Sequence, residues 1–241
     1  MENWTPEHSL VVLTYTKPDL IRARAFEVAN LYGERDDVEF LIFDNGSNEF
    51  SMRLELAALS TAPQLTHRKF GFHVERVEPN VGFGGGWNAA IPSTRGSVIH
   101  LLSDDVRITG DIIGAVERAA MSWGGPDWIV GQQRVMAGGW NQFNGFTIPY
   151  LMGYYLAMPR NVWDRLGGFD AETFHPYDFE DVDLSHRAAK FNVALLTVPD
   201  LPLVHEVAGT IGYSPERYEH TVRMRAAFAR KHGLRNEPER P

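Results

Sequence analysis

The sequence predicts a single α/β domain with a mostly parallel central sheet flanked by helices. Short apolar runs alternate with stretches of helical periodicity along the first half of the chain, and turn-forming residues separate them. A length of 241 residues suits one sizeable domain, and 44% hydrophobic with 22% charged residues is an ordinary globular composition. No internal repeat, low-complexity tract or long linker interrupts the sequence. We therefore treat residues 1–241 as one domain.

The first half of the chain predicts strands that are joined by helices. Continuous apolar runs at Ser9–Thr14 and Val38–Phe43 are typical of strands covered on both faces. Pro18 opens a helix that continues to about Leu31. The later elements are a strand, a Gly-rich turn with a short helix after it, and another strand: His73–Val77, Gly82–Gly86 continuing through Ala90, and Ser97–Leu102. This alternation favours a parallel sheet with helices on both faces.

After about residue 124 the second half predicts short strands and three further helices. The expected strands are Trp128–Val130, Tyr154–Met158 and Val193–Val198, and the expected helices are Arg160–Leu166, Glu180–Phe191 and about Pro215 to His232. Ligands of open α/β sheets bind outside the carboxyl ends of the strands. The informative residues should therefore follow the strands, and polar or Gly-rich segments do so at Thr14-Tyr15, Asp44-Asn45, Asn80–Gly86 and Asp104-Asp105.

The composition excludes several classes of site. The chain has no cysteine, which removes disulfides, zinc ribbons, iron–sulfur clusters and thiol nucleophiles. A net charge of −8 argues against a protein that mainly grips a phosphate backbone. The N-terminal residues lack the basic start and apolar core of a signal peptide, and no apolar run approaches the ~18 residues of a membrane span. We therefore expect a cytoplasmic protein without a stable membrane span.

Asp104 and Asp105 directly follow a predicted strand. Adjacent carboxylates repel each other and are stabilised by a shared cation. Oxygen ligands at the open edge of a sheet suit Mg²⁺ or Mn²⁺, which usually bind substrate phosphates as well. The alternative is an acidic turn that caps a helix near Thr109.

The Gly-rich segment from Asn80 to Asn88 resembles a phosphate-binding loop but fits neither standard pattern. No Gly-Lys-Ser/Thr ends it, and Trp87 stands where a dinucleotide-binding loop needs its third Gly. A backbone without side chains permits close approach to a ligand, while the simpler interpretation is close packing of a helix against the sheet.

Three carboxylates begin the helix at Glu180, Asp181 and Asp183. Acidic residues in a first turn complement the helix dipole, but a carboxylate held there is also a competent general base. His205 follows a Pro-rich strand at Pro199–Val204, and no second His four residues later completes a zinc-protease motif. A lone His is more often structural than a ligand.

Two further features remain open at this level. Aromatic side chains between Trp123 and Tyr155 are typical of a core, or of a surface that stacks on sugar rings. The basic residues of the last helix are typical of a solvated face, or of a surface for an anionic acceptor or a membrane; they are Arg217, Arg223, Arg225, Arg230 and Lys231.

Taken in order, these segments resemble family 2 glycosyltransferases of the GT-A fold, especially the rhamnosyl- and galactofuranosyl-transferase-like branch. The resemblance runs from about Ser9 to Gly233. The segments that carry it are VVLTYTKPDLI, FLIFDNGSN, PNVGFGGGWNAAI, VIHLLSDDV, GYYLAMPRNVWDRLGGFD, FEDVDLSHRAAKFN and VPDLPLVH.

The resemblance implies a role for each candidate residue. Thr14, Tyr15 and Asp44 would hold the base and ribose of a nucleotide sugar, and the donor would be lined by Gly82, Phe83, Gly84 and Asn88. Asp105, with Asp104, corresponds to the Asp-X-Asp metal motif in a Ser-Asp-Asp form, and His205 to a metal-binding His. Asp181 corresponds to the catalytic base, with Glu180 positioning it, and Gly153 would face the acceptor.

The resemblance also implies an inverting, metal-dependent transfer from a UDP-, dTDP- or GDP-sugar to a hydroxyl of a glycan, lipid, protein or modified nucleic acid. Residues of about 9–122 would bind the donor, and those of about 123–233 would bind the acceptor and carry catalysis. The protein would then act in the cytoplasm or at the inner membrane face. The oligomeric state is left open.

Two other functions remain as alternatives. A sugar-phosphate nucleotidyltransferase would need a Gly-rich loop after the first strand, where this chain reads Thr14-Tyr15-Thr16-Lys17-Pro18. A non-catalytic carbohydrate-binding domain would have no need of the combination of Asp104-Asp105, Asp181 and His205.

Overall fold

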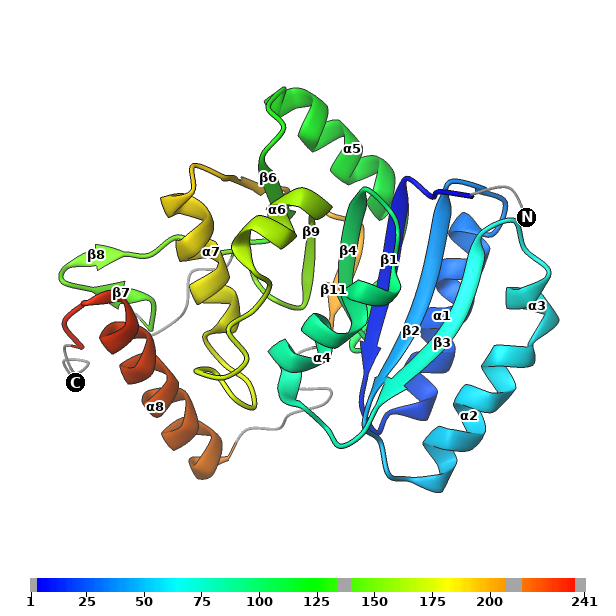
Figure 1. The fold of residues 1–241 in the computed structure, drawn as a ribbon, viewed down its shortest axis with the longest axis horizontal. Coiled ribbons are helices and arrows are strands. Elements are labelled where there is room, and N and C mark those ends of the chain that lie inside the picture. Colours follow the sequence, from blue (N-terminus) through cyan, green and yellow to red (C-terminus); the bar gives the residue numbers. More distant parts are fainter. Residues whose placement is uncertain (1–3, 134–139, 207–213, 237–241) are drawn as a thin grey trace.

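The computed structural model describes residues 4–133, 140–206 and 214–236. A seven-stranded sheet forms its centre, in the order β10-β6-β9-β4-β1-β2-β3 (Figure 1). The strands are β1 (His8–Thr14), β2 (Val38–Asn45), β3 (Gly71–Val77), β4 (Val98–Ser103), β6 (Trp128–Gly131), β9 (Tyr155–Pro159) and β10 (Ala194–Thr197). Strand β9 is antiparallel to β4 and β6, and the other neighbours are parallel. The predicted mostly parallel sheet is confirmed.

Helices cover both faces of this sheet. Side chains alternate along β1, so Leu10 and Val12 join the core on one face while Val11 and Leu13 join the core on the other. The first face is covered by α1 (Pro18–Tyr32), α2 (Phe50–Thr61), α3 (Pro63–Thr66) and α5 (Ile112–Trp123). The second face is covered by α4 (Gly82–Ala90), η1 (Ile91–Ser93), α6 (Arg160–Leu166) and α7 (Glu180–Lys190). None of the described helices is both long and apolar enough to cross a bilayer.

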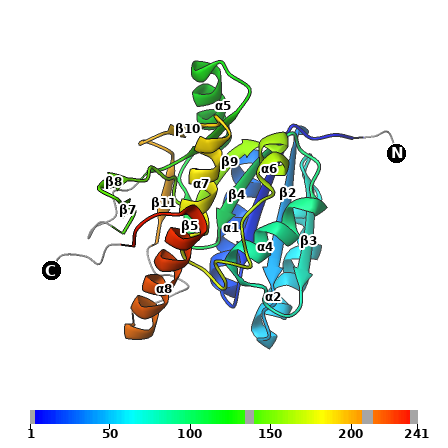
Figure 2. The ribbon, with the colours of Figure 1, turned by 60° about the vertical axis from the view of Figure 1, so that its left-hand side comes forward.

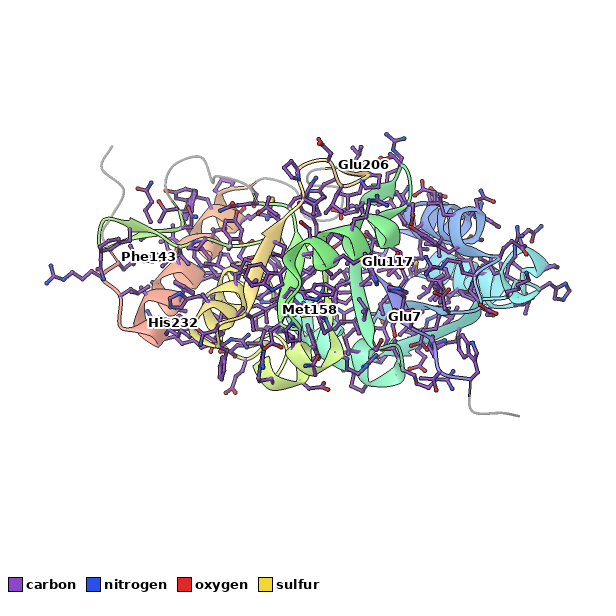
Figure 3. All side chains as sticks on the ribbon, turned by 90° about the horizontal axis from the view of Figure 1, so that it is seen from above. Glu7, Glu117, Phe143, Met158, Glu206 and His232 are labelled. Atoms are coloured by element: carbon purple, nitrogen blue, oxygen red, sulfur yellow. The ribbon has the colours of Figure 1, made fainter. Side chains whose placement is uncertain are left out.

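The last helix, α8 (Pro215–His232), lies at the end of the molecule opposite the N-terminus (Figure 1 and Figure 2). It packs into a third apolar cluster, in which its Phe228 lies 5.2 Å from the ring of Phe143 and 4.6 Å from that of His232. Figure 3 shows Phe143 and His232 at this same end. The solvated-face interpretation is wrong for Arg225, which is buried and donates hydrogen bonds to the carbonyls of Trp140 and Gln142.

The parallel register brings the carboxyl ends of three strands to one edge. Thr14 pairs with Asp44 across β1 and β2, and Leu13 pairs with Ser103 across β1 and β4. The polar residues that follow these strands therefore share one edge of the sheet, as the sequence predicted.

A small separate sheet lies beside that edge. Strand β5 (Val106–Ile108) pairs antiparallel with β11 (Leu203–His205), so that His205 stands opposite Val106. The sequence did not predict β5, because three residues are too few to show periodicity. A second short hairpin joins β7 (Gln142–Phe143) to β8 (Phe146–Thr147).

The structure corrects the prediction of a Gly-rich turn. Helix α4 begins at Gly82, so the glycines lie inside the helix and not in a turn before it. A Cβ at Gly84 would meet the Cβ of Phe169 at 3.0 Å, so a larger residue there would crowd Phe169. The aromatic tract is core in part: Trp128, Phe143, Tyr150 and Tyr155 are buried, while Trp123 and Phe146 are exposed. Residues 134–139 of that tract lie outside the described residues.

Candidate active site

A cavity of about 670 Å³ opens at the carboxyl edge of the sheet. Several parts of the chain contribute to its wall: the end of β1, the start of α4, the turn after β4, the first turn of α7, the end of β11 and one side of α8. Most of the predicted site residues line it: Thr14, Tyr15, Gly82, Phe83, Asp104, Asp105, Gly153, Glu180, Asp181 and His205.

Asp105 and His205 face each other across the β5–β11 pair. The His205 Nε2 lies 3.5 Å from the Asp105 Oδ2. The Glu206 backbone N–H donates to the Asp105 carbonyl at 2.9 Å, which continues the strand pairing. The Tyr154 ring stacks on the imidazole with a centroid distance of 4.3 Å and an angle of 21°. The Tyr154 ring against one face and the Asp105 carboxylate near Nε2 thus orient the imidazole.

Asp104 has a different role from its neighbour. Its Oδ2 accepts a hydrogen bond from the Thr14 hydroxyl at 2.6 Å and a longer one from the Tyr15 N–H at 3.4 Å. Asp104 therefore ties the end of β1 to the end of β4. The two acids do not cap the next helix, because Asp111 is the N-cap of α5 and accepts from the Gly114 N–H.

Three predicted donor residues are not brought to the cavity. Asp44 is fully buried and accepts from the Ser47 N–H at 3.1 Å, with the Arg76 guanidinium 3.6 Å away. The Asn88 amide accepts from the Phe169 N–H at 2.9 Å and donates to the Phe169 carbonyl at 2.8 Å. Gly84 packs against the same Phe169. In this structure all three residues make contacts within the protein and do not line the cavity.

Asp181 lies in the first turn of α7, where two backbone N–H groups hold its carboxylate. The Gly153 N–H donates to Oδ2 at 2.9 Å, and the Val182 N–H donates to Oδ1 at 2.8 Å. Burial raises the pKa of Asp181 to about 6, against the opposite effect of these N–H groups. Asp181 is therefore ionised at neutral pH and can accept a proton.

Glu180 differs from Asp181 in its surroundings. Burial raises the pKa of Glu180 well above its ordinary value, and the charge of Asp181 adds to the effect. Among the described residues, nothing forms a hydrogen bond with the Glu180 Oε2. Glu180 therefore takes up a proton more readily than an exposed glutamate does.

Sequence reasoning missed the cavity residues Asp178 and Thr221, whereas Tyr150 and Tyr154 belong to the aromatic tract that it marked as core or sugar-stacking. Asp178 carried a usable signal, because it lies close to Glu180 and Asp181 in an acidic segment. Arg217 also lines the cavity, although the sequence marked it only as one of the basic residues of the last helix.

The donor set of Asp105 and His205 fits a divalent cation. Two ligands that each lie about 2.1 Å from a cation, at right angles, are about 3 Å apart, which is close to the observed 3.5 Å. Among the described residues no third His or acid completes a cluster here. A cation bound at this pair would therefore need oxygen ligands from water or from a substrate, and an imidazole ligand suits Mn²⁺ better than Mg²⁺.

Comparison with known proteins gives a consistent result. A family model described as Glycosyl transferase family 2 matches residues 9–183. No curated protein sequence matches the chain. A solved mannosyltransferase from Pyrobaculum calidifontis, in complex with GDP-Man and Mn²⁺, is 18% identical with a TM-score of 0.68, covering 98% of this chain and 67% of its own.

Two further solved structures have the same fold. TarS of S. aureus in complex with UDP is 15% identical, with a TM-score of 0.62 over 92% of this chain and 65% of its own. GalNAc-T7 with UDP, GalNAc and Mn²⁺ is 14% identical, with a TM-score of 0.66 over 91% of this chain and 48% of its own. This chain thus spans between about half and two thirds of the length of these proteins.

Proposed function

The chain belongs to glycosyl transferase family 2 and has the GT-A fold, and we propose that it transfers a sugar from a nucleotide-diphosphate sugar to an acceptor hydroxyl. One observation carries the proposal: the Asp105–His205 pair and the Asp181 carboxylate line the same cavity. That arrangement offers a site for a diphosphate-bound cation and a base for a hydroxyl.

We propose a UDP-, dTDP- or GDP-sugar as the donor and Mn²⁺ as the metal, with Mg²⁺ as the second choice. GDP-Man and UDP are bound by the similar solved proteins named above, two of them with Mn²⁺. Asp105 and His205 would hold the cation, and when bound it supplies positive charge to the leaving diphosphate. Thr14, Tyr15, Gly82 and Phe83 would contact the donor.

The reaction would be a single displacement that inverts the anomeric carbon. The acceptor oxygen attacks that carbon, its bond to the diphosphate oxygen breaks, and the hydroxyl proton passes to the Asp181 carboxylate. The N–H groups of Gly153 and Val182 keep that carboxylate in a fixed direction. Glu180, directly before Asp181 in the chain, would help to position the acceptor.

Residues of about 9–122 would bind the donor, and those of about 123–233 would bind the acceptor and supply the base. The acceptor would be a hydroxyl of a glycan, lipid, protein or modified nucleic acid. The sequence segments favour the rhamnosyl- and galactofuranosyl-transferase-like branch of the family.

Thermal-shift measurements with a panel of nucleotide sugars test this proposal. A matching donor with Mn²⁺ at about 100 times its Kd should stabilise the protein by about 2.7 kcal/mol. The same donor should then release nucleoside diphosphate slowly in water, because the base can also activate a water molecule. No stabilisation by any donor would contradict the proposal, and stabilisation without release or transfer would favour a non-catalytic carbohydrate-binding domain.

A further inference from the structure

Helix α8 lies beyond the residues that the family model matches, yet it forms one wall of the cavity. The match ends at residue 183, and α8 begins at Pro215. Arg217 and Thr221 of α8 line the cavity together with Asp178 and Asp181. The catalytic side of the cavity is therefore built partly by a segment outside the matched region.

Contacts from α8 converge on the short segment before α7. The Thr221 hydroxyl donates to the Asp178 Oδ2 at 2.6 Å, and the Arg217 guanidinium donates to the Asp178 Oδ1 at 3.4 Å. Directly before Thr221 in α8, the His220 Nε2 lies 2.7 Å from the Tyr177 carbonyl oxygen. These contacts fix both the side chain of Asp178 and the backbone before it.

The backbone of this segment needs such support. Asp178 and Phe179 both have left-handed conformations, with φ of 73° and 72°, although neither is Gly. Phe179 is the N-cap of α7 and makes no side-chain capping hydrogen bond. Its ring lies 5.8 Å from that of Phe228 in α8. Such conformations persist where the surroundings determine them, and here α8 supplies those surroundings.

Glu180 and Asp181 follow this backbone directly, so its conformation sets where α7 starts and where the Asp181 carboxylate points. We infer that Asp178 and Thr221 are positioning residues: α8 holds Asp178, and Asp178 holds the start of α7 so that Asp181 faces the acceptor. This inference rests on the proposed function, in which Asp181 is the base.

The test compares three variants with the wild-type protein. Thr221→Val removes the hydroxyl donor and keeps the shape, and Thr221→Ser restores the donor. Thr61→Val in α2 is the matched control: the Thr61 hydroxyl lies 3.2 Å from the carbonyl oxygen four residues earlier, as that of Thr221 lies 3.0 Å from its own, but Thr61 is exposed and has no contact with Asp178. Transfer kcat, KM for the acceptor, donor Kd with Mn²⁺ and Tm are measured for each.

Thr221→Val should lower kcat by about 10- to 100-fold, since it removes a hydrogen bond to a charged group that positions the base. Donor Kd should stay within about twofold, because the donor side of the cavity is untouched. Thr221→Ser should recover most of the kcat, and Thr61→Val should match wild type. Equal kcat for Thr221→Val and wild type would overturn the inference.

A pH profile provides a readout that folding alone would not change. The charged groups around the Asp181 carboxyl are Asp178 and Glu180 beside it in the chain and Arg217 of α8, which faces Glu180. The charge of Asp178 contributes to the raised pKa of Asp181. Asp178→Asn should therefore move the acidic limb of the kcat profile to lower pH while Thr221→Ser leaves it in place.

The outcomes separate this inference from the proposed function. If the wild-type protein neither binds a donor nor transfers a sugar to any acceptor, the proposed function itself is contradicted. An active wild type whose acidic limb does not move in Asp178→Asn would overturn the inference alone. If Thr221→Val fails to fold, the kcat of Thr221→Ser and the pH profile of Asp178→Asn decide whether the inference stands.

Discussion

The Asp105 carboxylate and the His205 imidazole face each other at 3.5 Å although they belong to distant parts of the sequence. The antiparallel pairing of β5 with β11 produces this approach, because it sets His205 opposite Val106, the residue after Asp105. Backbone hydrogen bonds, rather than a free loop, therefore determine the spacing of the two groups.

This pair leads to a prediction about metal-dependent binding. His205→Ala should weaken the affinity for a nucleoside diphosphate with Mn²⁺ by at least about tenfold, because one of two protein ligands is lost. Asp105→Asn should weaken it at least as much. Calorimetric titration with Mn²⁺ and with EDTA measures both. If His205→Ala weakens binding equally with EDTA, or lowers the Tm of the metal-free protein instead, His205 has a structural role.

Substitution of the proposed base should separate binding from transfer. Asp181→Asn keeps the size of the side chain and removes the proton acceptor, so transfer should fall by about 10²- to 10⁴-fold. Donor affinity should change little, because Asp181 is not among the residues that we propose to contact the donor. Glu180→Gln, which keeps the size of a carboxyl whose pKa burial raises, should cost less. Near-normal turnover in Asp181→Asn would show that another group is the base.

The raised pKa of Asp181 predicts how transfer depends on pH. The carboxyl must be ionised to accept a proton, and its pKa lies at about 6 because of burial. The kcat of transfer should therefore be maximal well above pH 6 and should fall about tenfold for each pH unit below it. Measurement of kcat at saturating donor and Mn²⁺, with a Tm at each pH as control, tests this. A constant kcat down to about pH 5 would contradict it.

The sequence predicted the edge of the sheet that carries the site, for a clear physical reason. Buried parallel strands are continuous apolar runs, and polar residues directly after them must lie at one edge. Thr14, Asp104 and Asp105 were found in this way and line the cavity. A separate signal, three acidic residues at the start of a predicted helix, placed Asp181 where a carboxylate is readily held by N–H groups.

The sequence could not show which strand-end side chains enter the cavity. Asp44 ends β2 as Thr14 ends β1, but it lies fully buried, and its Oδ1 accepts a hydrogen bond from the Ser47 N–H. The contribution of α8 was also out of reach, because Arg217 and Thr221 reach Asp178 only through tertiary packing. Such contacts leave no periodic signal in the chain.

The last prediction concerns Asn88, for which the resemblance implied a donor contact. Because its amide makes both of its hydrogen bonds to the backbone of Phe169, Asn88→Ala should lower the free energy of unfolding by about 1–3 kcal/mol and leave donor affinity nearly unchanged. Tyr15→Ala provides the contrast, since Tyr15 lines the cavity and is 37% exposed: donor affinity should fall while the free energy of unfolding stays close to that of wild type. Urea denaturation and donor titration of both variants measure the two effects. A loss of donor affinity in Asn88→Ala without a loss of stability would contradict this prediction and show that Asn88 contacts the donor. Its hydrogen bonds to Phe169 would then have to break when the ligand binds.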